Sequence, residues 1–99
     1  MSQVIIEMGR ADFGGIGVMA IAGGEVEEIT SSGTSQATTA VAQAGWFCTV
    51  INNGAETIWV QSGASPTAAA GSGRCIPPNS SRDFGGLAAG DKIAVINDS

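Results

Sequence analysis

Hydrophobic residues recur along this chain in short runs, and the most regular runs lie near the middle of the sequence. Two of them, Trp46–Ile51 and Thr57–Val60, are rich in β-branched and aromatic residues and flank Asn52-Asn53-Gly54-Ala55. Such residues suit a pleated, half-buried surface. Asn-Gly favours a type I′ turn, because it tolerates positive φ at both central positions. The pattern predicts a β-hairpin with Asn53-Gly54 as its two-residue loop.

This turn also fixes how the two strands would pair. It sets Cys48 opposite Trp59, and the alternation of side chains places Trp46 on the same face. Phe47 would lie on the other face beside Ile58. One face of the hairpin would form core, and the other would be partly exposed or covered by a partner.

Similar runs with a two-residue period occur along the rest of the chain. The other expected strands are Ser2–Met8, Ile16–Ala22, Glu25–Thr30, about Gln36–Gln43, Arg74–Ile76, Ser80–Phe84 and Asp91–Asn97. Gly23-Gly24 is expected to be a hairpin turn, and Gly9–Gly15 and Gly63–Gly73 are expected to be loops. No apolar stripe with helical period is present. The sequence predicts an all-β fold, a small β-sandwich or jelly-roll-like domain of about seven to nine short strands.

The 99 residues correspond to one domain, residues 1–99. Residues 1–9 are expected to form an edge strand, or an extended N-terminal arm that completes the sheet of a neighbouring molecule. Much of the 43% hydrophobic content is alanine, so the core should be thin. A thin core favours association with a partner.

Charge is sparse and its balance is acidic. Four Lys and Arg residues and a net charge of −5 cannot neutralise a run of phosphates, which argues against nucleic-acid binding. The same sign disfavours anionic membrane surfaces. The only close group of acids, Glu25, Glu27 and Glu28, is expected on a solvated edge strand that is protected against unwanted pairing.

The two cysteines, Cys48 and Cys75, are too few for a disulfide-stapled scaffold, and we expect buried free thiols. The start of the chain lacks a basic segment followed by an apolar core, so no signal peptide is expected and folding should occur in a reducing cytoplasm. No apolar run is long enough for a transmembrane helix.

The string Asp-Phe-Gly-Gly occurs twice, as Asp12–Gly15 and Asp83–Gly86, each near an arginine. Asp-Phe-Gly is a magnesium-binding motif in protein kinases, but a kinase also needs a glycine-rich loop, a strand lysine and a catalytic loop. We expect two similar turns, each of which buries a phenylalanine.

Other catalytic and metal-binding patterns are also missing. The chain has no histidine, which excludes the usual serine triad and the cysteine-protease arrangement. Two distant cysteines do not make a zinc site. Asp83, Asp91 and Asp98 lack the spacing of a calcium loop, and we interpret them as turn and cap residues. The sequence therefore predicts a protein that is not an enzyme, with no cofactor and no metal site.

A series of short motifs covers about three quarters of the chain, from Glu25 to its end. They are Glu28-Ile29-Thr30-Ser31-Ser32, Thr49-Val50-Ile51-Asn52-Asn53-Gly54, Ile58-Trp59-Val60, Ser65-Pro66-Thr67-Ala68, Ile76-Pro77-Pro78 before Phe84, and Gly90-Asp91-Lys92-Ile93-Ala94-Val95-Ile96. This order resembles that of the capsid decoration (cement) proteins of tailed bacteriophages. The first 24 residues lie outside the resemblance.

The resemblance implies a structural virion protein, made in the host cytoplasm, that binds the outer surface of the major capsid protein shell and stabilises it. It also implies a homotrimer. Candidate interface residues are Val4, Ile6, Phe13, Trp46, Trp59 and Phe84. The alternative is a tail or head-fibre module that recognises host surface glycans through Trp46 or Trp59, since an indole can stack on a sugar.

Overall fold

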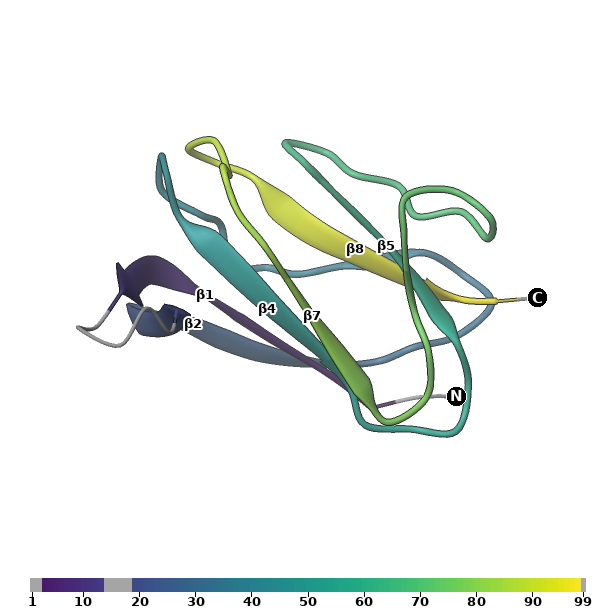
Figure 1. Ribbon diagram of the computed structural model, residues 1–99. Coiled ribbons are helices and arrows are strands. Elements are labelled where there is room, and N and C mark those ends of the chain that lie inside the picture. Colours follow the sequence, from purple (N-terminus) through teal and green to yellow (C-terminus); the bar gives the residue numbers. More distant parts are fainter. Residues whose placement is uncertain (1–2, 14–18, 99) are drawn as a thin grey trace.

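The computed structural model describes residues 3–13 and 19–98, with side chains for residues 3–10 and 24–98. Its strands are β1 (Gln3–Phe13), β2 (Met19–Thr30), β3 (Gln36–Ala37), β4 (Phe47–Asn52), β5 (Ile58–Gly63), β6 (Arg74–Ile76), β7 (Ser80–Phe84) and β8 (Lys92–Asn97). They form two antiparallel four-stranded sheets, ordered β2-β1-β4-β7 (the first sheet) and β3-β8-β5-β6 (the second sheet), which make the two layers of a sandwich (Figure 1). The predicted all-β sandwich is confirmed, and the described residues contain no helix, hence none that could cross a membrane.

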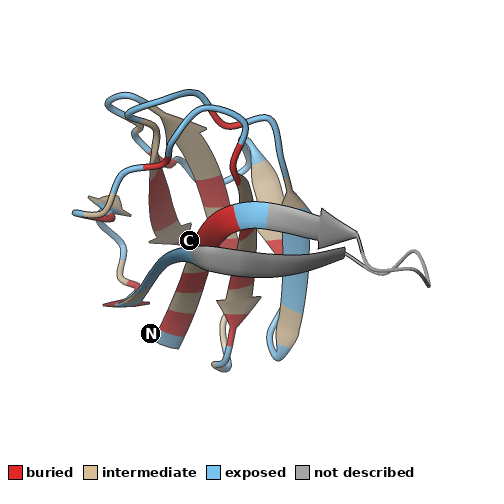
Figure 2. Ribbon diagram, turned by 90° about the vertical axis from the view of Figure 1, so that its left-hand side faces the viewer, coloured by how far each residue is buried: buried red, intermediate tan, exposed pale blue. Residues whose placement is uncertain are grey.

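The core lies between the two sheets and follows the alternation of the strands. Burial alternates along β4 and β5, and Figure 2 shows it as bands of buried and half-buried residues. The inward-facing side chains with at most 1% of their surface exposed include Val4, Ile6, Met8, Cys48, Val50, Ile58, Val60, Ile76, Ile93 and Val95. Burial of such side chains stabilises a fold by about 1.5–3 kcal/mol each. The core is therefore built mainly from medium-sized aliphatic residues contributed by both sheets.

The predicted central hairpin is wrong. β4 pairs with β1 and β7, whereas β5 pairs with β6 and β8, so the two strands belong to different sheets. Neither Asn53 nor Gly54 has the positive φ that a type I′ turn requires. The alternation within each run was predicted correctly, but the buried rows of Cys48 and Ile58 face each other across the sandwich. In the predicted hairpin, Cys48 and Ile58 would lie on opposite faces of one sheet, so only one of their two rows could face the core. Because the chain crosses to the other sheet between β4 and β5, both rows are buried.

The expected turn at Gly23-Gly24 is also wrong. β2 runs through both glycines, and the register of β1 and β2 shifts between Met8 and Arg10, which marks a β-bulge. A Cβ on Gly24 would lie 1.4 Å from the backbone oxygen of Met8, so only glycine fits this close approach. The glycines bend a continuous strand and do not end it.

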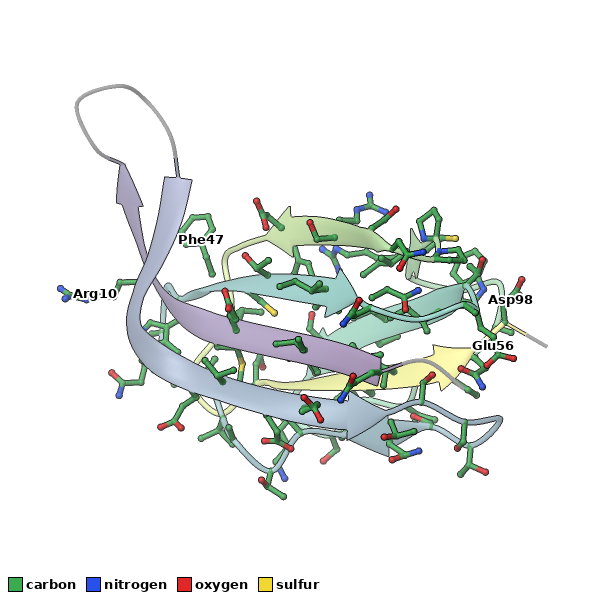
Figure 3. All side chains as sticks on the ribbon, turned by 90° about the horizontal axis from the view of Figure 1, so that it is seen from below. Arg10, Phe47, Glu56 and Asp98 are labelled. Carbon is green, nitrogen blue, oxygen red and sulfur yellow. The ribbon has the colours of Figure 1, made fainter. Side chains whose placement is uncertain are left out.

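The N-terminal segment differs from the expected edge strand or exchanged arm. β1 is an interior strand of the first sheet, flanked by β2 and β4, and the sheet's edges are β2 and β7. β1 also continues to Phe13, through most of the expected loop at Gly9–Gly15. Its partner β4 begins at Phe47, opposite Gly9, so residues 10–13 pair only with β2. This part of the β1–β2 pair projects past the sandwich, and Arg10 points away from the molecule (Figure 3).

The C-terminal half agrees more closely with the sequence. β6 and β7 have the predicted bounds, and β8 begins one residue later than expected. The expected strand at about Gln36–Gln43 shrinks to the two residues of β3. Residues 16–18 of the expected strand Ile16–Ala22 lie outside the described residues, and β2 begins at Met19. The central and C-terminal strand positions were thus predictable, although their partners were not.

The predicted loop between β5 and β6 covers the outer side of the second sheet. The backbone N–H of Ala68 donates a hydrogen bond of 2.8 Å to the Ser35 hydroxyl, which lies beside β3. Since β8 lies between β3 and β5, the loop passes over β8 to reach Ser35. Ala94 alternates with the inward-facing residues of β8 and is nevertheless fully buried, as a covering loop requires.

Candidate functional site

Three of the predicted interface residues lie inside the molecule. Val4 and Ile6 have no exposed surface, and Trp46 is 8% exposed. All three belong to the core cluster and are covered by the chain itself. Trp46 therefore has no open indole face on which a sugar could stack, so the glycan alternative keeps only Trp59.

Trp59 and Phe84 are half-buried and lie in different sheets. The Trp59 indole N–H donates a hydrogen bond of 3.0 Å to the Asp98 carboxylate. The guanidinium of Arg74 lies 4.1 Å from the centre of the Phe84 ring, a cation–π contact that covers one face of the ring. The side chain of Phe13 lies outside the described residues. The structure does not gather the other five predicted interface residues on one surface.

The second Asp-Phe-Gly-Gly string ends β7. The Asp83 carboxylate accepts a hydrogen bond of 2.7 Å from the Thr49 hydroxyl, and Phe84 packs against the core. Gly86 has a φ of 75°, as expected for a turn. A Cβ on Gly85 would lie 2.1 Å from the Phe47 ring, so that glycine makes room for an aromatic side chain. Of the first string, Gly14-Gly15 lies outside the described residues.

Both cysteines are free, and they differ in burial. Cys48 is buried in the core, whereas Cys75 is half-buried on β6. Burial raises the pKa of the Cys48 thiol to about 12, and the nearby Asp83 and Glu7 carboxylates act in the same direction against the charge of Arg74. Within the part of the chain that the structure describes, no three His, Cys, Asp or Glu side chains gather as a metal site would require.

An open hollow of about 740 Å³ lies between β2 and the segment that follows β3. Its lining residues are Glu25, Val26, Glu27, Thr39, Ala40, Val41, Gln43 and Trp46. Val26 and Val41 are the two exposed large hydrophobic residues in the described part of the chain, with 68% and 45% of their surface exposed. Both line this hollow, and the buried Trp46 belongs to its wall. The exposed large apolar side chains of the described residues are therefore both at this hollow.

Glu27 connects the two sides of the hollow. Its carboxylate accepts hydrogen bonds from the backbone N–H groups of Thr39, at 2.9 and 3.1 Å, and of Ala40, at 3.0 Å. The Thr39 hydroxyl adds a further bond of 3.1 Å. Burial disfavours the ionised form of Glu27, but these bonds and the charge of Lys92 outweigh it and lower the pKa of the carboxyl. Glu27 is thus a structural clamp that holds the hollow in shape.

The edge of β2 beside the hollow carries backbone groups that point away from the sheet. The Gln3 carbonyl accepts a hydrogen bond from the N–H of Asn53, so the backbone groups of Gln3 point towards β4. Thr30, which lies opposite Gln3, must then direct its own groups away from β1. The same alternation applies to Val26 and Glu28. Within the described residues β2 pairs only with β1, so these N–H and C=O groups face the open edge.

This combination is suited to binding rather than to covalent chemistry. It offers backbone donors and acceptors in a row, a hollow of mixed polar and apolar lining beside them, and the carboxylates of Glu25 and Glu28 on the same strand. The sequence indicated the acidic edge strand through Glu25, Glu27 and Glu28. It did not reveal the hollow, because Val41 and Trp46 reach it only through the fold. The sequence held one indication of the hollow, which is Val26, an apolar residue at an outward position between Glu25 and Glu27.

The comparisons with known proteins identify no relative. No family model, no curated protein and no solved structure matches the chain.

Proposed function

We propose that this chain is a capsid decoration protein of a tailed bacteriophage, which binds the outer surface of the major capsid protein shell and stabilises it as a homotrimer. The observation that carries the proposal is the small β-sandwich whose longest edge strand, β2, leaves backbone groups and a partly apolar hollow open to a partner. The motif order from Glu25 onward, which resembles such proteins, supports the same function.

Physical arguments make such a role suitable for this molecule. A clamp on a shell needs a rigid body with a complementary surface, and weak contacts repeated on a symmetric lattice add up to high avidity. The two sheets supply the rigid body, since the core is closed on both sides by regular strands. The sparse charge and the thin core are consistent with a protein that works in an assembly.

The test is to purify virions of the phage that encodes the chain and to measure its copy number relative to the major capsid protein. Near-stoichiometric amounts on the head are expected. Heads that lack the protein should lose their DNA at a lower temperature and should recover when purified protein is added. A chain found only in the cytosol of infected cells, or heads whose stability does not respond to it, would contradict the proposal. Light scattering of the free protein tests the trimer separately.

A further inference from the structure

The open edge of β2 and the hollow beside it form one continuous surface, which we name the β2 edge site (Gly24–Thr30 with Thr39–Gln43). We propose that the β2 edge site binds an extended, lysine- or arginine-bearing segment of another protein, which adds to the first sheet as a further strand. The inference goes beyond the proposed function, because it follows from this geometry whether or not the partner is a shell protein.

The backbone of β2 supplies the first part of the argument. Val26 and Glu28 each direct one N–H and one C=O to the open edge, so an added strand gains a short ladder of main-chain hydrogen bonds. The Thr30 carbonyl on the same edge already accepts a hydrogen bond of 3.0 Å from the Gln36 side chain. This contact shows that the edge groups are accessible to a donor from outside the sheet.

The hollow supplies the second part. Side chains of an added strand alternate between the two faces, so every second residue points towards the inner side of β2. There it meets Ala40, Val41 and Trp46, which line a space large enough for an aliphatic side chain. The Glu27 carboxylate accepts hydrogen bonds from the backbone of Thr39 and Ala40. These bonds hold the two sides of the hollow in place and leave no unpaired Glu27 charge in it.

Charge complementarity identifies the occupant. Glu25 lines the hollow, and Glu28 lies on the outer face of β2, where its carboxylate accepts a hydrogen bond of 2.6 Å from the Gln3 side-chain amide of β1. No Lys or Arg is among the residues that line the hollow. A second copy of this chain would bring its own Glu25 and Glu28 against the first, and like charges on paired strands are destabilising. A segment with basic residues on its outward side instead gains attraction from Glu28, which shares that face, and Glu25 adds a longer-range attraction from the inner side. The acids therefore discourage self-pairing and admit a cationic partner.

Alternation and charge together define the segment. Its outward residues, beside Val26 and Glu28, carry the positive charges, and its inward residues are aliphatic. The probe is the acetylated and amidated peptide Lys-Val-Lys-Val-Lys. One control peptide, Glu-Val-Glu-Val-Glu, reverses the charge, and a second, Lys-Ser-Lys-Ser-Lys, removes the apolar side chains.

The experiment is a titration of the full ¹⁵N-labelled chain with each peptide, followed through its amide NMR signals. The lysine–valine peptide should shift the amide signals of residues 24–30 and 39–43. The affinity of each control peptide should be lower by a factor of about ten or more. Equal binding of the acidic peptide, or shifts confined to other strands, would overturn the proposal. Shifts of the same amides on concentrating the protein alone would assign the edge to a second copy and would also overturn it.

Variants locate the contact. Val26→Pro removes an N–H that the β1 ladder does not use, so the chain should fold and bind the peptide about tenfold more weakly. Ser81→Pro is the matched control on β7, the opposite edge of the same sheet, and should bind as the wild type does. Val26→Lys keeps all backbone N–H groups and adds a positive charge that repels the basic peptide, so it should also bind the peptide more weakly. It provides the test if the Val26→Pro variant does not fold. Unchanged affinity in Val26→Lys would overturn the proposal.

Discussion

The side-chain amide of Asn52, on β4 of the first sheet, donates a hydrogen bond of 3.1 Å to the backbone carbonyl of Ile76, on β6 of the second sheet. The same amide also donates to the carbonyls of Glu56, at 2.7 Å, and Pro77, at 3.1 Å. Asn52 is fully buried, so it fixes the crossing between β4 and β5 against both sheets from inside the molecule.

We expect Asn52→Ala to destabilise the protein strongly, because it leaves three carbonyl groups without this donor. Loss of a buried partner costs about 1–3 kcal/mol, and the cavity adds to that loss. The free energy of unfolding, measured by urea denaturation, should fall accordingly. Asn53→Ala is the matched control, since Asn53 is exposed and its hydrogen bond to Gln3 uses the backbone. An equal effect of both variants would show that the amide is not the anchor.

Glu27 should make the protein sensitive to acid. The hydrogen bonds from Thr39 and Ala40 lower the pKa of this carboxyl below its ordinary value of 4.5. Its stabilising contribution is therefore complete above that value and is lost as the pH falls through the lowered pKa. Glu27→Gln should lower the free energy of unfolding at pH 7 by about 1 kcal/mol, since the bonded carboxylate is partly exposed.

The measurement for Glu27 is thermal unfolding from pH 7 down to pH 3. The gap between the wild type and Glu27→Gln should narrow as the pH falls. Glu25→Gln is the control, because Glu25 is exposed and lies on the same strand. A gap that stays constant with pH would mean that ionisation of Glu27 does not contribute to stability.

Cys48 should produce the opposite dependence at high pH. The folded state holds the pKa of this thiol at about 12, above its ordinary value of 9.0, so the unfolded chain releases the proton first. The contribution of the Cys48 thiol to stability is fully present at a pH below 9.0, and it is lost progressively as the pH rises from 9.0 towards about 12. The free energy of unfolding should fall by about 1.4 kcal/mol per pH unit across that window. Cys48→Ala should remove this slope and Cys75→Ala should keep it; a slope that survives in Cys48→Ala would refute the assignment.

Gly24→Ala should disrupt the bend in β2, because its Cβ would collide with the backbone oxygen of Met8. We expect a loss of about 2 kcal/mol or more, the cost of forcing atoms into a closed space. Gly33→Ala has open space around the added carbon and should change stability by less than about 0.5 kcal/mol. Chemical denaturation of the two variants compares these positions directly.

The sequence predicts the strands of this fold better than it predicts their partners. The alternation of Phe47 and Cys48 assigns one to each face of β4, because the period of a strand is a local property. Asn53-Gly54 looks like a hairpin turn for the same local reason. The competing requirement, that the buried rows of β4 and β5 both face a core, depends on the whole sandwich and outweighs the turn preference.

Gly23-Gly24 is a second place where the local sequence does not determine the structure. Two glycines are compatible with a turn or with a bulge, and the choice depends on whether β1 continues opposite them. It does continue, to Phe13, so the pair became a bulge. The candidate site could be predicted only in part. Its acids share one short run, but the hollow requires Val41 and Trp46, which the fold brings to β2 from a different part of the chain.

The crossing between β4 and β5 also affects how the chain reaches its native state. A local hairpin there would have given the molecule an early nucleus, whereas β4 must find β1 far upstream and β7 far downstream before its ladder is complete. Closing such long loops costs entropy before any contact repays it, and sandwiches of this kind fold in about milliseconds to seconds. The fold therefore gains a core enclosed on both sides at the cost of slower folding, and during that interval the carboxylates of Glu25 and Glu28 oppose pairing of β2 with the same strand of another molecule.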